Sequence, residues 1–261
     1  LEALPDQPMR ILTVPLAGCT RPLLRLVAAR GGLQRGLSGT RNGHAGDEMP
    51  DLGHVVYPEC KLGELSQETL DKAQIFANAK RTCREVDGMS VSSLREAYDI
   101  QAGITDIATQ FVRGMMNRVL LHNGWRVGAT SELARKEMGL SEPYRAPLYS
   151  GYEKKTNSRL RWEEQGTALV SVGAGLGFRL ARPLMPREDA YSEEEVWEAV
   201  AALVPVIHLS ATRVPDAIDR TPETAFLRIA DWGLLGSVVV GNDVSAEGVD
   251  RGALSAVRVK R

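Results

Sequence analysis

The strongest constraint on the fold is a change of hydrophobic periodicity close to Trp125. Before that residue, Ser93 and Glu96 form the capping-box pattern that favours the start of a long helix. Apolar residues then recur at the spacing of one helix face, which predicts a core-facing stripe: Ile100, Ile104, Ile107, Phe111 and Met115. A shorter helix is expected before it, over residues 66–81.

After Trp125 the chain breaks into short runs rich in β-branched residues, which is typical of strands. These runs cover residues 125–127, 167–172, 178–180, 205–210 and 237–240. A second capping box, Ser192 with Glu195, predicts one helix among them. The apolar residues of that helix are expected to be Val196, Trp197, Val200, Ala201 and Val204. Helices first and strands afterwards indicate an α+β domain.

Composition argues against several kinds of partner. The formal net charge is −1 and aromatic residues make up 5% of the chain, so neither charge nor stacking surface favours direct nucleic-acid binding. The cysteines, Cys19, Cys60 and Cys83, are widely spaced, which favours a reducing compartment over a disulfide framework. No apolar run reaches the roughly 18 residues that a membrane span needs.

The first 46 residues differ in charge from the rest. No Asp or Glu lies between Gln7 and Gly46, whereas arginine recurs through the same stretch, and Thr20 followed by Pro22 favours a helix start. This composition is typical of a mitochondrial transit peptide and equally of an extended, solvated basic arm. Residues 47–65 are expected to be a linker, and residues 66–261 a domain.

Local motifs alone do not identify a reaction. Glycines at 173, 175 and 177 follow a strand, but Phe178 stands where a dinucleotide-binding loop needs a small residue, and Pro183 opposes the helix that should follow. The histidines are not at metal-ligand spacing. His208 lies in an apolar run, which is typical of a buried, hydrogen-bonded side chain.

Six short segments nevertheless occur in an order that forms a pattern. They are residues 97–101 (AYDIQ), 124–131 (GWRVGATS), 138–143 (MGLSEP), 172–180 (VGAGLGFRL), 207–213 (IHLSATR) and 230–231 (AD). Taken together, they resemble the 2-keto-4-pentenoate hydratase and 4-oxalocrotonate decarboxylase branch of the fumarylacetoacetate hydrolase superfamily. The resemblance extends from about residue 72 to about residue 245.

This resemblance implies a mixed β-sandwich roll with helices packed outside it. Active members bind Mg²⁺ or Mn²⁺ through three carboxylates, and the metal holds a 2-oxo or 2-hydroxy acid and stabilises the enolate that forms. Active relatives also continue with further strands after the position of Gly241. The domain is therefore expected to be C-terminally shortened.

This sequence departs from the family at each position that carries the chemistry. The metal-binding glutamates fall on Gly173, Gly175 and His208. The family's lysine, aspartate and asparagine fall on Arg126, Ala211 and Trp232. Glycine has no ligand atom, and one imidazole cannot hold a cation that takes about six hard oxygens. The resemblance thus implies a degenerate site with no metal, no other cofactor and no catalytic residue.

We therefore expect a pseudoenzyme that is a structural subunit of a large assembly on the matrix side of mitochondria, with a respiratory or ATP-synthase complex favoured. Its partners would be other protein subunits. Two alternatives stay open. A metal-independent lyase, tautomerase or decarboxylase would bind a 2-oxo acid with Arg126 and use His208 as base. A small-acid-binding module would use the backbone N–H groups of residues 173–177.

Overall fold

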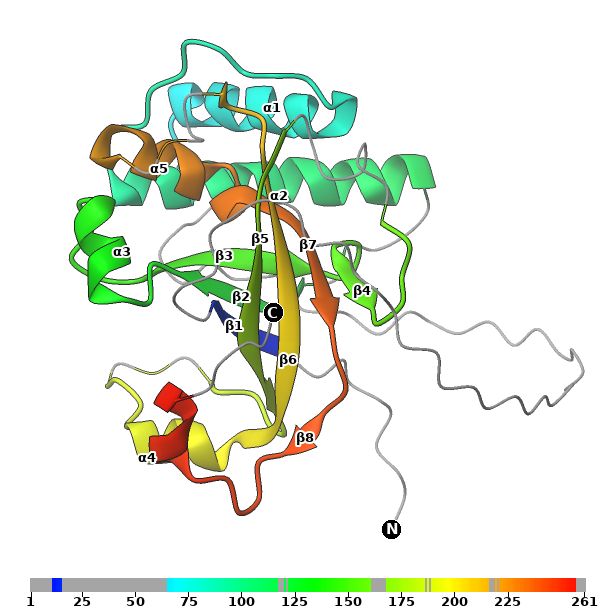
Figure 1. The fold of residues 1–261 in the computed structure, drawn as a ribbon. Helices are drawn as coiled ribbons and strands as arrows, with labels where there is room; N and C mark the ends of the chain where they lie inside the picture. Colours follow the sequence, from blue (N-terminus) through cyan, green and yellow to red (C-terminus); the bar gives the residue numbers. More distant parts are fainter. Residues whose placement is uncertain are drawn as a thin grey trace, which may run out of the picture.

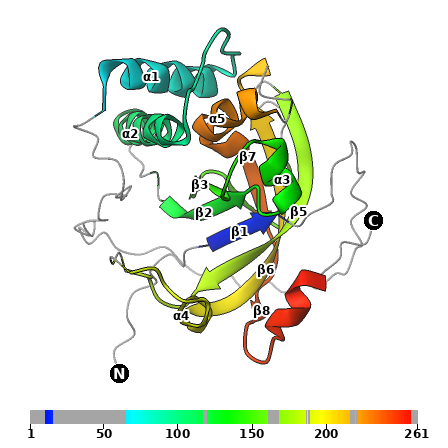
Figure 2. The ribbon, with the colours of Figure 1, turned by 90° about the vertical axis from the view of Figure 1, so that its left-hand side faces the viewer.

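The structure is a computed structural model, and it describes residues 11–15, 65–116, 120, 122–160, 168–185, 187, 189–215, 219 and 221–256. A strongly curved mixed sheet forms the body of this part of the chain (Figure 1). Three helices, α1 (Gln67–Thr82), α2 (Leu94–Met116) and α5 (Pro222–Ala230), lie together over one side of it (Figure 2). This is an α+β arrangement, as the order of periodicities predicted.

The two long helices begin where the sequence predicted. The Ser66 hydroxyl accepts a hydrogen bond from the N–H of Thr69, at 3.1 Å, and α1 starts one residue later. In α2, Ile100 and Ile104 are buried, but Met115 is 74% exposed, so the predicted core stripe ends before it. None of the helices in the described part is both long and apolar enough to cross a membrane.

The described strands form an eight-stranded sheet with the order β3-β2-β1-β5-β6-β7-β4, and β8 pairs with β6 outside this path. Strands β5 and β6 are antiparallel over nearly their full length and form the long axis of the molecule (Figure 1). The strands are β1 (Ile11–Pro15), β2 (His122–Gly128), β3 (Tyr144–Tyr149), β4 (Glu153–Lys155), β5 (Ala168–Leu180), β6 (Val200–Thr212), β7 (Leu235–Val240) and β8 (Val244–Ser245).

The sheet curls into a roll, so that strands far apart in its order approach each other. The side-chain amide of Asn123, on β2, donates a hydrogen bond of 3.0 Å to Glu153 on β4. Along β6, the residues Val204, Val206 and His208 alternate with more exposed neighbours and are buried. These alternate positions define the inner face of the roll, because successive strand residues point to opposite faces.

The remaining helical elements connect the strands. The short helices α3 (Glu132–Glu137) and α4 (Glu193–Glu198) begin at Ser131 and Ser192, whose side chains accept hydrogen bonds from the third residue beyond each cap. The 3-10 turns η4 (Trp232–Leu234) and η5 (Arg251–Ala256) precede β7 and follow β8. The capping box predicted at Ser192 and Glu195 is confirmed.

The structure corrects the predicted extent of that helix. It ends at Glu198, and Val200, Ala201 and Val204 belong to β6. Val200, Ala202, Val204 and Val206 alternate along the chain, and β-branched residues favour the strand over continued helix. Likewise, residues 168–172 of one predicted run and residues 178–180 of the next are parts of the single strand β5, and residue 167 lies outside the described residues.

Strand β1 was not predicted, because it lies in the segment interpreted as a basic arm. It pairs in parallel with β2 and in antiparallel with β5, so it occupies the position between them. Residues 11–15 are therefore part of the sheet. The helix predicted from Thr20 lies outside the described residues, and so does the linker predicted over residues 47–65, apart from residue 65.

Candidate functional site

The six positions that the resemblance singled out lie on adjoining elements of the roll. Arg126 is on β2, Gly173 and Gly175 are on β5, His208 and Ala211 are on β6, and Trp232 is in η4. The register pairs Gly173 with His208 and Gly175 with Val206. Positions far apart in the sequence are thus neighbours across two strands.

Arg126 is a buried cation whose guanidinium contacts groups within the fold. It is 7% exposed. One terminal nitrogen donates to the carbonyl oxygen of Gly233 at 2.8 Å, and the other to the hydroxyl of Ser210 at 3.1 Å. These contacts link β2 with β6 and η4, which gives Arg126 a structural role in the described part.

His208 is buried, and among the described residues neither of its ring nitrogens has a hydrogen-bond partner. Its residue is only 3% exposed, and it neighbours the Arg126 charge. Burial first, and the nearby Arg126 cation second, lower the pKa of His208 from 6.5 to about 3. The imidazole is consequently neutral at physiological pH and a weak base. The prediction that His208 is an interior histidine is confirmed, and the described residues provide no hydrogen bond to its ring.

Gly173 of β5 leaves room on the inner face of the sheet. A Cβ atom added to it would meet no described residue within 4 Å. Residues 173–177 pair with β6, and residues 175–177 also pair with β1 on the other side. Their backbone N–H groups therefore belong to a sheet ladder, which argues against the anion-binding loop of the small-acid alternative.

The turn that carries Trp232 has an unusual backbone. Trp232, Gly233 and Leu234 have φ values of 47°, 59° and 61°, the left-handed region that L-residues adopt at a cost. The indole of Trp232 is buried, and its N–H donates to the carbonyl of Gln101 at 3.3 Å. Gly233 has no room for a side chain, since an added Cβ would lie 2.8 Å from that of Ala146. The turn presents the Gly233 carbonyl to Arg126.

A buried ion pair lies directly before this turn. The carboxylate of Asp231 accepts from the guanidinium of Arg213, at 2.8 Å for Nε, and from the backbone N–H of Arg213 at 3.0 Å. The hydroxyl of Thr212 lies 3.4 Å from the same carboxylate. The backbone carbonyl of Arg213 accepts from Val86, in the segment between α1 and α2. This network joins β6, the end of α5 and the helical layer.

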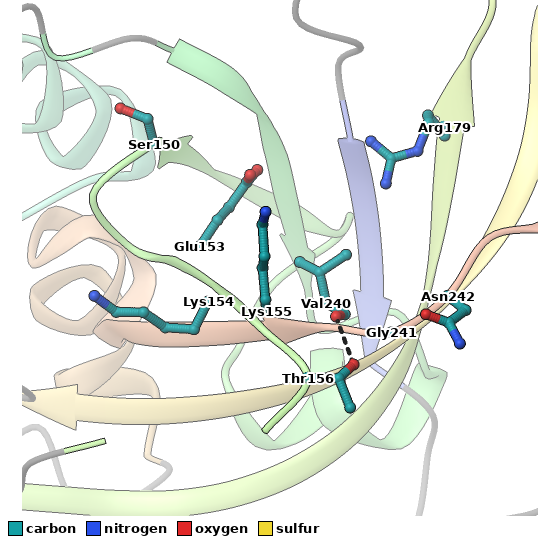
Figure 3. A pocket seen from close by; sticks show the side chains of 9 residues that line it. All are labelled: Ser150, Glu153, Lys154, Lys155, Thr156, Arg179, Val240, Gly241 and Asn242. Atoms are coloured by element: carbon teal, nitrogen blue, oxygen red, sulfur yellow. Dashed lines mark hydrogen bonds between the residues drawn. The ribbon is translucent and has the colours of Figure 1, made fainter. Parts of the chain in front are cut away.

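A polar cavity of about 580 Å³ opens between β4, β5 and the end of β7, and sequence reasoning missed it (Figure 3). Glu153 and Lys155 point to one side of β4 and Lys154 points away, while Arg179 faces the cavity from β5. Burial raises the pKa of Glu153, and its contacts with Asn123 and Arg179 oppose that rise. No motif marks these residues, because the cavity depends on how the sheet curls.

The six positions offer few side-chain atoms that could bind a metal ion. Gly173, Gly175 and Ala211 have no side-chain ligand atom, and Arg126 is a cation. In the described ranges, no group of three His, Cys, Asp or Glu side chains is arranged to hold a metal ion. The residues present at these positions do not fit a magnesium or manganese site.

Comparison with known proteins identifies the fold class. No family model matches the chain, and no curated protein matches it. Solved structures do match, and they show a mixed α+β roll of the fumarylacetoacetate-hydrolase type.

Two of the matching structures are of 4-oxalocrotonate decarboxylase from Pseudomonas putida G7. One is complexed with magnesium and adipate and has a TM-score of 0.55 at 19% identity. The other is complexed with calcium and acetate and has a TM-score of 0.53 at 20% identity. Each match covers 71% of this chain and 67% of the decarboxylase. At this identity the likeness establishes the fold.

Proposed function

We propose that this chain is a pseudoenzyme: a hydratase-like domain that has lost metal-dependent chemistry and acts as a structural subunit of a mitochondrial assembly. The observation that carries the proposal is the register pair of Gly173 and His208. By the resemblance, both positions hold metal-binding glutamates in active relatives. Here they supply one imidazole and no carboxylate.

The chemistry of the neighbouring residues supports this proposal. A catalytic Mg²⁺ needs several hard oxygen ligands, and Gly173, Gly175 and His208 supply no carboxylate. The guanidinium of Arg126 already donates to Gly233 and Ser210. These groups stabilise the roll in place of a metal, and the fold persists without the reaction.

The same residues count against a metal-independent enzyme. That alternative needs Arg126 to bind a substrate carboxylate and His208 to accept a proton. The pKa of His208, about 3, makes it a weak base, and Arg126 would have to give up its hydrogen bonds to Gly233 and Ser210. Neither residue lines the polar cavity beside β4.

Metal content and turnover test the loss of chemistry. We expect purified protein to contain no stoichiometric Mg²⁺ or Mn²⁺ by elemental mass spectrometry, and calorimetric titration with either ion to give no saturable heat. We also expect no turnover of 2-hydroxy-2,4-pentadienoate with either metal present. Stoichiometric metal together with turnover would refute the pseudoenzyme proposal.

Restoring the carboxylates tests the assignment of the positions. The triple variant Gly173→Glu, Gly175→Glu, His208→Glu should bind Mn²⁺ at least roughly tenfold more tightly than wild type. The matched control carries Val172→Glu, Ala174→Glu and His208→Glu, which moves both β5 carboxylates to the other face of the strand. Circular dichroism establishes that each variant is folded. Equal Mn²⁺ binding by the two folded variants would show that the positions are not equivalent to metal ligands.

The assembly is tested on the native protein. The Arg-rich, acid-free composition of residues 7–46 supports a mitochondrial destination, with a respiratory or ATP-synthase complex favoured. Gentle extraction of mitochondria, native electrophoresis and mass spectrometry of the band should find the chain in a large complex at fixed stoichiometry. Migration as a monomer or small homo-oligomer would contradict the structural-subunit role.

A further inference from the structure

A second cavity lies in the helical layer and has a different character from the one beside β4. It measures about 520 Å³, within the roughly 300–1,000 Å³ typical of small-molecule pockets. Residues of α1 line one side, residues of α2 line the other, and Tyr152 contributes from the segment before β4. Helices α1 and α2 lie next to each other in both views (Figures 1 and 2).

The α2 side of this cavity is apolar. It consists of Ile104, Ile107, Ala108, Phe111 and Val112. Of these, Ile104 is buried, and the side chains of Ile107 and Ala108 pack partly into the core. This wall offers an apolar surface to an apolar part of a ligand.

The α1 side is positively charged. Lys80 and Arg81 line the cavity, its other polar side chains are uncharged, and no Asp or Glu is among the lining residues. The guanidinium carbon of Arg81 lies 5.6 Å from the centre of the Phe111 ring. The cations therefore stand beside the apolar wall, with no lining carboxylate to neutralise them.

Lys80 is held at the inner end of the cavity by aromatic rings. Its Nζ lies 4.5 Å from the ring centre of Tyr152 and 4.8 Å from that of Trp232. It donates one hydrogen bond, of 3.2 Å, to the carbonyl oxygen of Leu235. The nearby carboxylate of Asp231 is already bound by Arg213. The described residues give Lys80 no ion pair.

The pKa of Lys80 agrees with this geometry. Burial first, and the Arg213 cation second, lower the pKa of Lys80 well below its usual 10.5. An anion bound beside the amine would favour its charged form and offset part of the cost of burying it.

We propose that the cavity between α1 and α2 binds a small monocarboxylic acid with an apolar body. The carboxylate would lie at the Lys80 and Arg81 end, and the apolar body would lie along Ile104, Ile107 and Phe111. Charge complementarity selects the anion, and the α2 wall selects against small, fully polar acids. The site is separate from the degenerate positions on β5 and β6.

Calorimetric titration of the full chain with octanoate tests this site, with 1-octanol as a neutral probe of the same length. We expect saturable octanoate binding at least roughly tenfold tighter than that of 1-octanol. Lys80→Met should weaken octanoate binding by about tenfold and leave 1-octanol unchanged. The control Lys136→Met removes an exposed lysine of α3 and should leave both affinities unchanged.

Two further variants separate charge from shape if Lys80→Met disturbs folding. Arg81→Gln should weaken octanoate selectively, whereas Phe111→Ala should weaken both probes, because it shortens the shared apolar wall. Equal binding of octanoate and 1-octanol, absence of octanoate binding, or equal losses in Lys80→Met and Lys136→Met would each overturn the proposal.

Discussion

At the scale of single residues, His208 and Arg126 show how burial changes what a side chain can do. If they were exposed to water, both side chains could react or bind a ligand. In the roll, a neutral imidazole lies near a cation that donates to a backbone carbonyl and a hydroxyl. Their environment makes them parts of the interior and leaves the folding equilibrium sensitive to acid.

The pH dependence of stability should report His208. The folded pKa, about 3, lies below the ordinary 6.5, so the unfolded chain takes up this proton first as pH falls. Stability is therefore lost progressively from pH 6.5 towards pH 3, by at most about 5 kcal/mol. Urea unfolding at pH 7, 6 and 5 should show this loss in wild type, and a smaller loss in His208→Leu.

Glu96 provides the comparison for that experiment. Hydrogen bonds from Lys72 and Ser92 outweigh burial and lower its pKa from 4.5 to about 2, so its contribution is lost only below pH 4.5. Glu96→Gln should therefore change the stability profile below pH 4.5 and leave the pH 5–7 region as in wild type. Identical profiles for wild type and His208→Leu between pH 7 and 5 would contradict the depressed pKa of His208.

Gly233 should tolerate no side chain. Its φ of 59° and the 2.8 Å approach of an added Cβ to Ala146 both oppose alanine. Gly233→Ala should lower the free energy of unfolding by about 2–4 kcal/mol. Gly88, with φ of 67° and nothing near its Cβ position, isolates the backbone effect, and Gly88→Ala should cost only about 1 kcal/mol. Equal losses in the two variants would mean that the contact with Ala146 does not matter.

At the scale of elements, α2 carries two glycines in opposite environments. A Cβ on Gly103 would lie 2.7 Å from that of Ala73 on α1, whereas one on Gly114 would meet nothing within 4 Å. Thermal or urea unfolding of two alanine variants should therefore show opposite signs. Gly103→Ala should destabilise by about 1–3 kcal/mol, and Gly114→Ala should stabilise by about 0.5–1 kcal/mol. Stabilisation by Gly103→Ala would show that the helices are less closely packed there.

The elements also show what sequence patterns can and cannot decide. Capping boxes located the starts of α2 and α4 correctly, because an N-cap acts through local hydrogen bonds. The predicted end of α4 was wrong, because the valines from residue 200 onward fit both a helical and a strand period. Strand β1 escaped prediction because its partners, β2 and β5, lie more than a hundred residues away along the chain.

At the scale of the whole molecule, the ion pair of Asp231 and Arg213 connects the sheet to the helices. Asp231→Asn would leave a buried guanidinium without its counter-charge and should cost about 3–5 kcal/mol. The pair of Asp243 with Arg179 is partly exposed, so Asp243→Asn should cost less than about 1 kcal/mol. Urea unfolding measures both, and similar small losses would mean that water reaches the interior pair.

The sequence singled out the positions of the candidate site, but it did not predict the contacts that their side chains make. The resemblance singled out Arg126 and His208, and the fold brings them near each other. The partner of Arg126, the Gly233 carbonyl, depends on a left-handed turn that has no sequence signature in non-glycine residues. The cavities beside β4 and between α1 and α2 depend on sheet curvature and helix packing, which a linear pattern does not encode.

The inner place of β1 in the sheet has a consequence for how this protein folds. Residues 11–15 are synthesised before both neighbours of β1, because β2 and β5 lie more than a hundred residues further along the chain. The middle of the sheet must therefore wait for distant parts of the chain, which slows folding and favours help from chaperones.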